Sequence, residues 1–268
     1  MNEIKAKFTL ITGACGGLGG AFVSLLASKG EPLCLTGRSE ERLNALAAKL
    51  KAEYPELPVV CRACDLKDSD SRLKFFAWAK EEGISFSRLI YAAGADNQKA
   101  FEKYSEETLL MQSRVNFEGA VSFVRGFLDC AVLDGTCELL AIGSVSGIYP
   151  MPYFALYSAT KRALEQFFSA LRTELKGRAK VTCVLPGAIP TREDVKAYIK
   201  TQGLWGRLAA LPPEKVAKKS LKAVRRNKRR VVIGFWNKLM NAFTRLIPLP
   251  FKMKFIAKKW SKTEKGIY

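Results

Sequence analysis

Short apolar runs alternate with longer amphipathic stretches along the first 187 residues. The runs predict buried strands, and the stretches predict helices with one apolar face. Helices are expected up to about residue 29, over about 39–52 and 70–82, and from about 212 onward. Strands are expected at 8–11, 33–36, 59–61, 89–93, 138–142, 181–185 and 230–233. Strands that alternate with helices predict an α/β fold, a single domain with a Rossmann-type, doubly wound parallel sheet.

The pattern changes after residue 234, where a basic amphipathic extension over 235–268 follows the domain predicted for 1–234. Lysines separate and flank its apolar residues, and Pro248 and Pro250 interrupt them. The apolar residues recur at helical spacing: Trp236, Leu239, Met240, Phe243, Leu246 and Ile247, and later Phe251, Phe255, Ile256 and Trp260. This composition is typical of a helix that lies on an anionic membrane surface. The same face could instead pack on the domain or form a subunit contact.

Charge follows the same division. Of 44 Lys and Arg and 25 Asp and Glu, 20 basic and 2 acidic residues follow residue 195. Nucleic-acid binding would rest on this charge alone, because no nucleic-acid motif accompanies it. The sequence shows no apolar run long enough to span a bilayer, and its first residues do not resemble a secretory signal. Seven cysteines without such a signal predict reduced thiols in a cytoplasmic protein. The basic extension adds peripheral binding at a membrane as an alternative location.

A glycine-rich turn follows the first strand, and the stretch TGACGGLG places Gly13, Gly17 and Gly19 in a TGxxxGxG pattern. Such a turn lets the backbone approach a pyrophosphate at the start of a helix, although a plain strand–helix turn can look similar. Arg38 stands at the end of the second strand, where an arginine favours the 2′-phosphate of NADP and an acid would favour NAD. Asp65, after the third strand, could accept from the adenine amino group. CxxC spacing at Cys61 and Cys64 predicts no metal site, since the chain has no histidine and no second CxxC.

Three further motifs concern chemistry. The stretch YSATK places Tyr157 and Lys161 on one face of a helix, at i and i+4. Ser144, in GSVSG, follows a buried strand at the sheet edge where ligands bind in such folds. Asn116 is a polar residue in a largely apolar predicted helix.

With Pro186-Gly187, these motifs occur in the order and spacing of the short-chain dehydrogenase/reductase family, which the chain resembles densely over about 5–190 and loosely to about 234. The resemblance implies that Tyr157 is the general acid in reduction and the base in oxidation. Lys161 would lower the pKa of the phenol and hold the nicotinamide ribose, and Ser144 would hold the substrate carbonyl. Asn116 would complete a water-linked proton path. The implied cofactor-binding residues are Gly13, Cys15, Gly16, Gly17, Leu18, Gly19, Arg38, Asp65, Leu66, Gly94, Tyr157, Lys161, Pro186, Gly187, Ile189 and Thr191.

One position departs from the family. Ala92-Ala93-Gly94 stands where most members have Asn-Ala-Gly, whose asparagine braces the central strands. The polar segment over 96–98 could supply a substitute hydrogen bond.

Substrate expectations rest on a lid that the resemblance implies over about 188–211. Its apolar residues are Val195, Tyr198, Ile199, Leu204, Trp205 and Leu208, and an apolar stretch before Tyr157 contains Tyr149, Met151, Pro152, Tyr153 and Phe154. We expect an NADP(H)-dependent oxidoreductase that interconverts a hydrophobic ketone and a secondary alcohol, with a steroid-like or long acyl chain, unless these residues only pack on the domain. The alternatives are a 3-oxoacyl reductase of lipid synthesis and a non-catalytic protein that senses dinucleotide at a membrane surface. By analogy with relatives, we expect a homo-oligomer, a dimer or tetramer.

Overall fold

A computed structural model of the chain describes residues 6–191, 193–201 and 203–261. All neighbouring strands of its seven-stranded sheet are parallel, in the order β3-β2-β1-β4-β5-β6-β7. The strands are β1 (Lys7–Thr12), β2 (Leu33–Gly37), β3 (Val59–Ala63), β4 (Ser85–Tyr91), β5 (Cys137–Ile142), β6 (Ala179–Leu185) and β7 (Arg230–Val232). The expected doubly wound fold is therefore confirmed.

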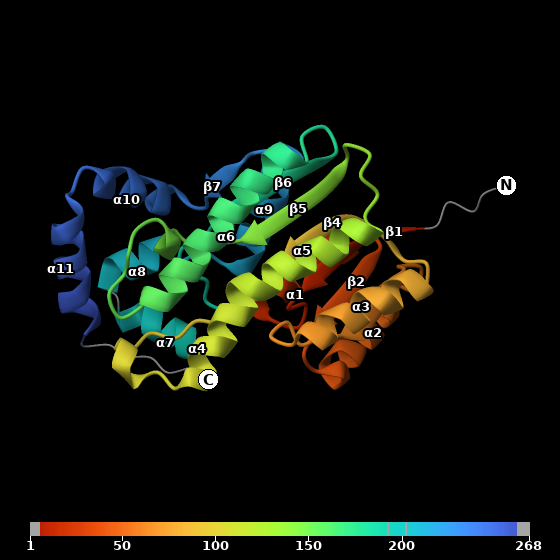
Figure 1. The fold of residues 1–268 in the computed structure, drawn as a ribbon, viewed down its shortest axis with the longest axis horizontal. Coiled ribbons are helices and arrows are strands. Elements are labelled where there is room, and N and C mark those ends of the chain that lie inside the picture. Colours follow the sequence, from red (N-terminus) through yellow and green to blue (C-terminus); the bar gives the residue numbers. More distant parts are fainter. Residues whose placement is uncertain (1–5, 192, 202, 262–268) are drawn as a thin grey trace.

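Helices cover both faces of this sheet (Figure 1). They are α1 (Gly17–Ala27), α2 (Glu40–Glu53), α3 (Ser69–Glu81), α4 (Glu106–Ser113), α5 (Gly119–Cys130), α6 (Ala155–Glu174), α7 (Glu193–Thr201), α8 (Gly203–Ala209), α9 (Pro213–Arg225), α10 (Phe235–Arg245) and α11 (Leu249–Trp260). One apolar core gathers under α3, α5 and α6, around Phe75, Phe123 and Phe168. A second core, on the other face, gathers under α1, α2 and α9. Because both faces are covered, the strands are apolar throughout rather than alternating.

The strand order reverses between β1 and β4. From β1 the chain builds outward through β2 and β3, and it then returns to start β4 on the other side of β1. The loops that follow β1 and β4 therefore run in opposite directions across the sheet and leave a crevice at its carboxyl edge. The glycine-rich turn leaves from β1, and the segment that begins at Ala92 leaves from β4.

The hydroxyl of Thr12 joins these two strands where the crevice opens. Its Oγ1 accepts hydrogen bonds from the backbone N–H groups of Ala92 and Ala93, each at 3.1 Å. Strand β4 consequently ends at Tyr91, two residues before the expected end. Thr12 thus braces the central strands from β1, where most family members use an asparagine. A further hydrogen bond from residues 96–98 stays a prediction.

The last quarter of the chain does not form one basic surface. Nine of its basic residues lie between Lys215 and Arg230, in α9, β7 and the turn between them. Helix α9 buries Val216, Leu221 and Val224 in the core, so this part belongs to the α/β domain. The prolines separate the amphipathic extension into two helices, α10 and α11, as the sequence indicates.

Thr12→Val should lower the free energy of unfolding by roughly 1 kcal/mol, because it removes the acceptor of the half-buried Ala93 N–H. Urea denaturation measures this change. Thr12→Ser keeps the hydroxyl and should recover most of the loss. Equal stability of Thr12→Val and the wild type would show that the brace is dispensable.

Candidate active site

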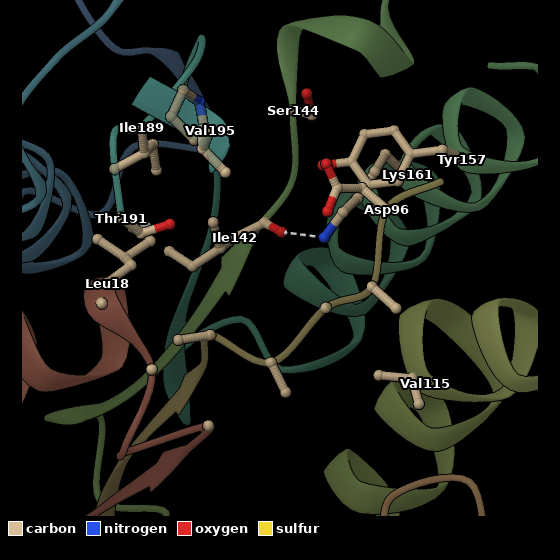
Figure 2. A pocket seen from close by; sticks show the side chains of 18 of the residues that line it. Leu18, Asp96, Val115, Ile142, Ser144, Tyr157, Lys161, Ile189, Thr191 and Val195 are labelled. Carbon is tan, nitrogen blue, oxygen red and sulfur yellow. Dashed lines mark hydrogen bonds between the residues drawn. The ribbon is translucent and has the colours of Figure 1, made fainter. Parts of the chain in front are cut away.

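A cavity of about 1120 Å³ occupies the crevice. Its wall contains every residue that we expected to bind a cofactor, from the glycine-rich turn to Thr191, together with Ser144. Figure 2 shows Ser144, Tyr157 and Lys161 on one side of this cavity and Leu18, Ile189 and Thr191 on the other. Segments far apart in the sequence therefore converge here, although their binding of a dinucleotide remains a prediction.

The glycine-rich turn leaves its backbone accessible because it has no room for side chains. Gly13 has φ +65°, in the left-handed region that favours glycine. A Cβ at Gly19 would lie 2.0 Å from the carbonyl oxygen of Gly13, and one at Gly17 would lie 2.5 Å from Thr191. Helix α1 begins at Gly17, and no side chain of the described residues caps it. Its first N–H groups and its dipole can therefore receive a phosphate, so the turn fits a dinucleotide pyrophosphate.

Two arginines line the cavity beside this turn. Arg38 follows β2, as expected, and Arg42 lies in the first turn of α2. The Ser39 hydroxyl caps α2 by accepting from the Arg42 N–H at 3.2 Å, and Arg42 Nη2 donates to the Cys15 carbonyl at 3.0 Å. Our sequence analysis missed Arg42. The capping serine was the available signal, since it starts the helix at Glu40 and places Arg42 three residues on from the cap.

Asp65 and Leu66 line the cavity where the chain leaves β3. The Asp65 N–H donates to the Ser71 hydroxyl at 2.9 Å, and Asp65 Oδ1 accepts from the Lys67 N–H at 3.1 Å. These bonds hold the carboxylate at the cavity wall, where contact with an adenine amino group stays a prediction.

The reactive side chains come from β5 and α6. Ser144 Oγ accepts from the Ser146 N–H at 3.1 Å, which leaves its own proton available for donation. Lys161 is buried, and its Nζ donates to the Ile142 carbonyl at 2.9 Å (Figure 2). The same nitrogen lies 5.6 Å from the centre of the Tyr157 ring. Helical spacing thus brings the phenol and the ammonium to one site, one turn apart.

Asn116 lies behind the cavity wall rather than in it. A π-helical turn, Arg114–Glu118, interrupts the helix expected around it. Its side chain exchanges two 2.8 Å hydrogen bonds with the backbone of Ala95 and donates to Thr160 Oγ1 at 3.2 Å. A Cβ at Gly94 would lie 3.4 Å from Asn116 Oδ1 and 3.2 Å from Lys161 Nζ. Asn116 therefore fixes the loop that contacts Lys161, and its part in a proton path stays a prediction.

Burial controls the protonation of the reactive pair. It raises the pKa of Tyr157 well above its usual range; the nearby Asp96 carboxylate raises it further, and a hydrogen bond with Ser144 opposes both. Burial also lowers the pKa of Lys161 to about 8, against the effects of Cys183 and Asp96. Burial is the largest of the effects on Tyr157, and the lowering of its pKa that we expect from Lys161 together with a bound nicotinamide stays a prediction. Tyr157 therefore remains a protonated donor at neutral pH.

Apolar and aromatic side chains form the other part of the wall. The Phe154 ring stacks on Tyr157 with centroids 4.3 Å apart, and Trp260 of α11 lies 5.3 Å from Phe154. Of the expected apolar set, Tyr149, Met151, Phe154, Val195 and Ile199 line the cavity. Pro152, Tyr153 and Leu208 are not among the lining residues. The side chains of Tyr198, Leu204 and Trp205 lie outside those described.

Several lining residues were not apparent from the sequence: Asp96, Met111, Val115, Ala209, Asn237 and Trp260. No sequence motif marks Asn237. Its Nδ2 donates to the carbonyls of Ala209 and Ile233 at 2.9 and 2.8 Å. Both α10 and α11 thus contribute to the cavity through single side chains, which helical periodicity alone could not reveal.

The described residues hold neither a cluster of metal-ligating side chains nor a membrane-spanning helix. No three His, Cys, Asp or Glu side chains gather where they could hold a metal ion. No helix in this part of the chain is long and apolar enough to cross a bilayer. Of the CxxC pair, Cys64 is buried, and burial raises its pKa to about 11, so its thiol stays protonated.

Comparison with known proteins identifies similar chains. Residues 7–201 match the family model of the short chain dehydrogenases. A Drosophila melanogaster dehydrogenase/reductase SDR family protein 7-like is 26% identical over 241 residues, covering 87% of this chain and 74% of the relative. A Sphingobium yanoikuyae short-chain dehydrogenase, solved with NADPH, has TM-score 0.73 and 25% identity, covering 90% and 95% of the two chains. A 7beta-hydroxysteroid dehydrogenase has TM-score 0.81 at 19% identity, covering 93% and 96%, and shares the fold.

Lys161→Met should gain stability relative to the wild type near neutral pH and lose that gain as the pH rises. The lysine titrates at about 8 when folded and at about 10.4 when unfolded. Between these pH values the unfolded wild type binds more protons than the folded wild type, so the stability of the wild type rises with pH. The variant lacks the titrating lysine, so its stability does not rise in this way.

Urea denaturation at about pH 7 and about pH 9.5 should show the difference between the two proteins shifting by about 2 kcal/mol toward the wild type. The control is Lys176→Met, which removes an exposed lysine beyond the end of α6. The same shift in this control, or none in Lys161→Met, would mean that burial does not perturb Lys161.

Proposed function

The chain belongs to the short chain dehydrogenase family, oxidoreductases that act on CH–OH and C=O groups, and we propose that it reduces a hydrophobic ketone, or oxidises the secondary alcohol, with NADP(H). The observation that carries this proposal is the meeting of two groups of residues in one cavity. One group can hold a dinucleotide phosphate, and the other can donate a proton. A protein that only sensed the dinucleotide would not need the second group.

The residues of the second group have distinct tasks. When bound, NADPH supplies the hydride that reduces the carbonyl carbon. Ser144, with its own proton available, donates a hydrogen bond to the carbonyl oxygen and fixes its position. Tyr157, kept protonated by burial, delivers the proton to that oxygen. Lys161, with a pKa of about 8, is largely charged at neutral pH and stabilises the phenolate that proton transfer leaves.

The preference for NADP rests on charge. Arg38 and Arg42 line the cavity next to the glycine-rich turn, whereas Glu40 and Glu41 do not. Two guanidinium groups suit the 2′-phosphate, and no carboxylate stands at the strand end to accept from a 2′-hydroxyl. The NADPH complex of the similar Sphingobium protein supports the same choice.

The preference for an apolar substrate rests on the cavity wall next to Tyr157. Tyr149, Met151 and Phe154 border it from the segment before α6, and Val195 and Ile199 border it from α7. Contacts with these side chains favour an apolar body around the carbonyl, because they offer a sugar few hydrogen-bond partners.

Tyr157→Phe should reduce turnover by roughly 10²–10⁴-fold while leaving NADPH affinity nearly unchanged, because it removes only the transferable proton. NADPH consumption with a panel of steroid ketones, long-chain ketones, 3-oxoacyl thioesters and sugars tests both the acid and the substrate class. Turnover of sugars alone would overturn the apolar assignment. A wild type that binds NADPH but turns over no substrate would favour the sensing alternative.

Arg38→Ala and Arg42→Ala should each weaken NADPH binding by about 10- to 100-fold, the value of a charge-assisted hydrogen bond, and leave NADH binding unchanged. Arg38→Asp should reverse the order of the two cofactors. Titration with both measures this, and Arg62→Ala, at an exposed β3 position outside the cavity wall, is the control. Equal wild-type affinity for NADPH and NADH would contradict the assignment.

A further inference from the structure

Helices α10 and α11 carry most of the exposed large apolar side chains of the described residues. Nine of the twelve such side chains lie between Phe235 and Phe255. Figure 1 shows both helices at one end of the molecule, outside α6 and α8. Monomeric proteins seldom expose apolar side chains in such a cluster without a binding partner. We propose that these two helices dock the protein on an anionic lipid bilayer.

The apolar side chains lie at positions that suit an interface. Phe235, Leu239 and Phe243 recur every four residues on α10, and Phe251 and Phe255 do so on α11. The four phenylalanines are 62–71% exposed, and Leu246, at the corner between the helices, is 81% exposed. The alternative, that this face packs on the domain, is not seen at these positions. Only Asn237 among α10 residues is buried, and no residue of α11 is.

Charge selects the partner. Residues 235–260 contain six basic residues and no acidic residue. Lys238, Arg245, Lys254 and Lys258 are exposed, and among described residues none of them forms an ion pair. Within the described part of the chain no carboxylate neutralises these cations, so they are available to lipid phosphate and carboxylate groups.

A bilayer satisfies both properties of this surface, and other partners satisfy one. A second copy meeting through the same surface would bury the phenylalanines but would bring like charges together. A nucleic acid would neutralise the cations but would leave aliphatic side chains such as Leu239 and Leu246 in water. An amphipathic helix at a membrane interface buries its apolar side chains and keeps its cations at the headgroups.

The same helix reaches the candidate active site. Trp260 of α11 lines the cavity and packs on Phe154, which stacks on Tyr157. Lys252 Nζ lies 5.4 Å from the ring of Tyr149, another lining residue. Deleting α10 and α11 would therefore damage the cavity as well as the proposed docking surface, so the test must use point variants.

Co-sedimentation with vesicles of phosphatidylserine and phosphatidylcholine, or of phosphatidylcholine alone, tests the proposal on the full-length protein. The wild type should bind the anionic vesicles at low salt at least about tenfold more tightly than the neutral ones. Phe235→Ser/Phe243→Ser/Phe255→Ser should weaken this binding at least about tenfold by removing apolar burial. Lys238→Gln/Arg245→Gln/Lys254→Gln/Lys258→Gln should weaken it by a similar factor, and this loss should be largest at low salt.

Two matched controls make the assignment specific to this surface. Leu73→Ser/Phe101→Ser/Leu110→Ser removes the exposed large apolar side chains that the described residues carry outside 235–260. Lys215→Gln/Lys218→Gln/Lys219→Gln/Lys222→Gln removes the same charge from exposed positions of α9. Both controls should bind like the wild type.

Three results would overturn the proposal. The first is a wild type that fails to sediment with anionic vesicles at low salt. The second is equal loss of binding in the α9 control, which would indicate attraction to net charge alone. The third is a wild type that binds no vesicles and sediments as a dimer in sedimentation velocity, while the phenylalanine variant sediments as a monomer. That result would assign the surface to a second copy. Each readout is binding or assembly, so the result does not depend on finding a substrate.

Discussion

The site depends on one hydroxyl group at the point where the sheet reverses direction. Thr12 Oγ1 accepts two backbone N–H groups from the residues that follow β4 and so fixes the carboxyl ends of β1 and β4 relative to each other. The glycine-rich turn continues directly from Thr12, and the loop containing Gly94 continues directly from Ala93. Asn116 then holds that loop through Ala95, and the loop contacts Lys161. Hydrogen bonds from Thr12 and Asn116 therefore fix the loop that lies between the glycine-rich turn and Lys161.

Burial raises the pKa of Tyr157 and lowers the pKa of Lys161, the two groups at the centre of the site. It disfavours the phenolate of Tyr157 and the ammonium of Lys161, so each group is biased toward its neutral form. The Ile142 carbonyl, which can only accept, and the Asp96 carboxylate both favour the charged lysine. The cavity is thus arranged to keep a cation beside a neutral phenol, a state in which proton donation creates an attractive charge pair. Positive charge from a bound nicotinamide would act in the same direction as Lys161.

Sequence periodicity and spacing predicted the elements whose formation is local. The strands, the glycine-rich turn and the i, i+4 pair of Tyr157 and Lys161 follow from short-range rules, and the structure places them together at the expected sheet edge. Contacts between distant segments could not be read this way. Thr12 as the brace and Trp260 as part of the cavity wall depend on how elements pack. The effect of burial on the pKa of Tyr157 could not be predicted for the same reason, since charge is visible in a sequence and desolvation is not.

Helix α11 contributes both to the cavity wall and to the exposed apolar surface. Its Trp260 packs inward on Phe154, while Phe251 and Phe255 remain exposed. A helix with apolar side chains in both places cannot satisfy all of them by folding alone, because packing one set on the domain leaves the other in water. Burial of Phe251 and Phe255 in the apolar interior of a bilayer would also constrain α11. It would thereby constrain Trp260, which lies next to the Phe154–Tyr157 stack. Docking, as proposed, would therefore act on the cavity wall through one short helix, and an apolar substrate dissolved in the bilayer would lie close to the segment that forms the wall.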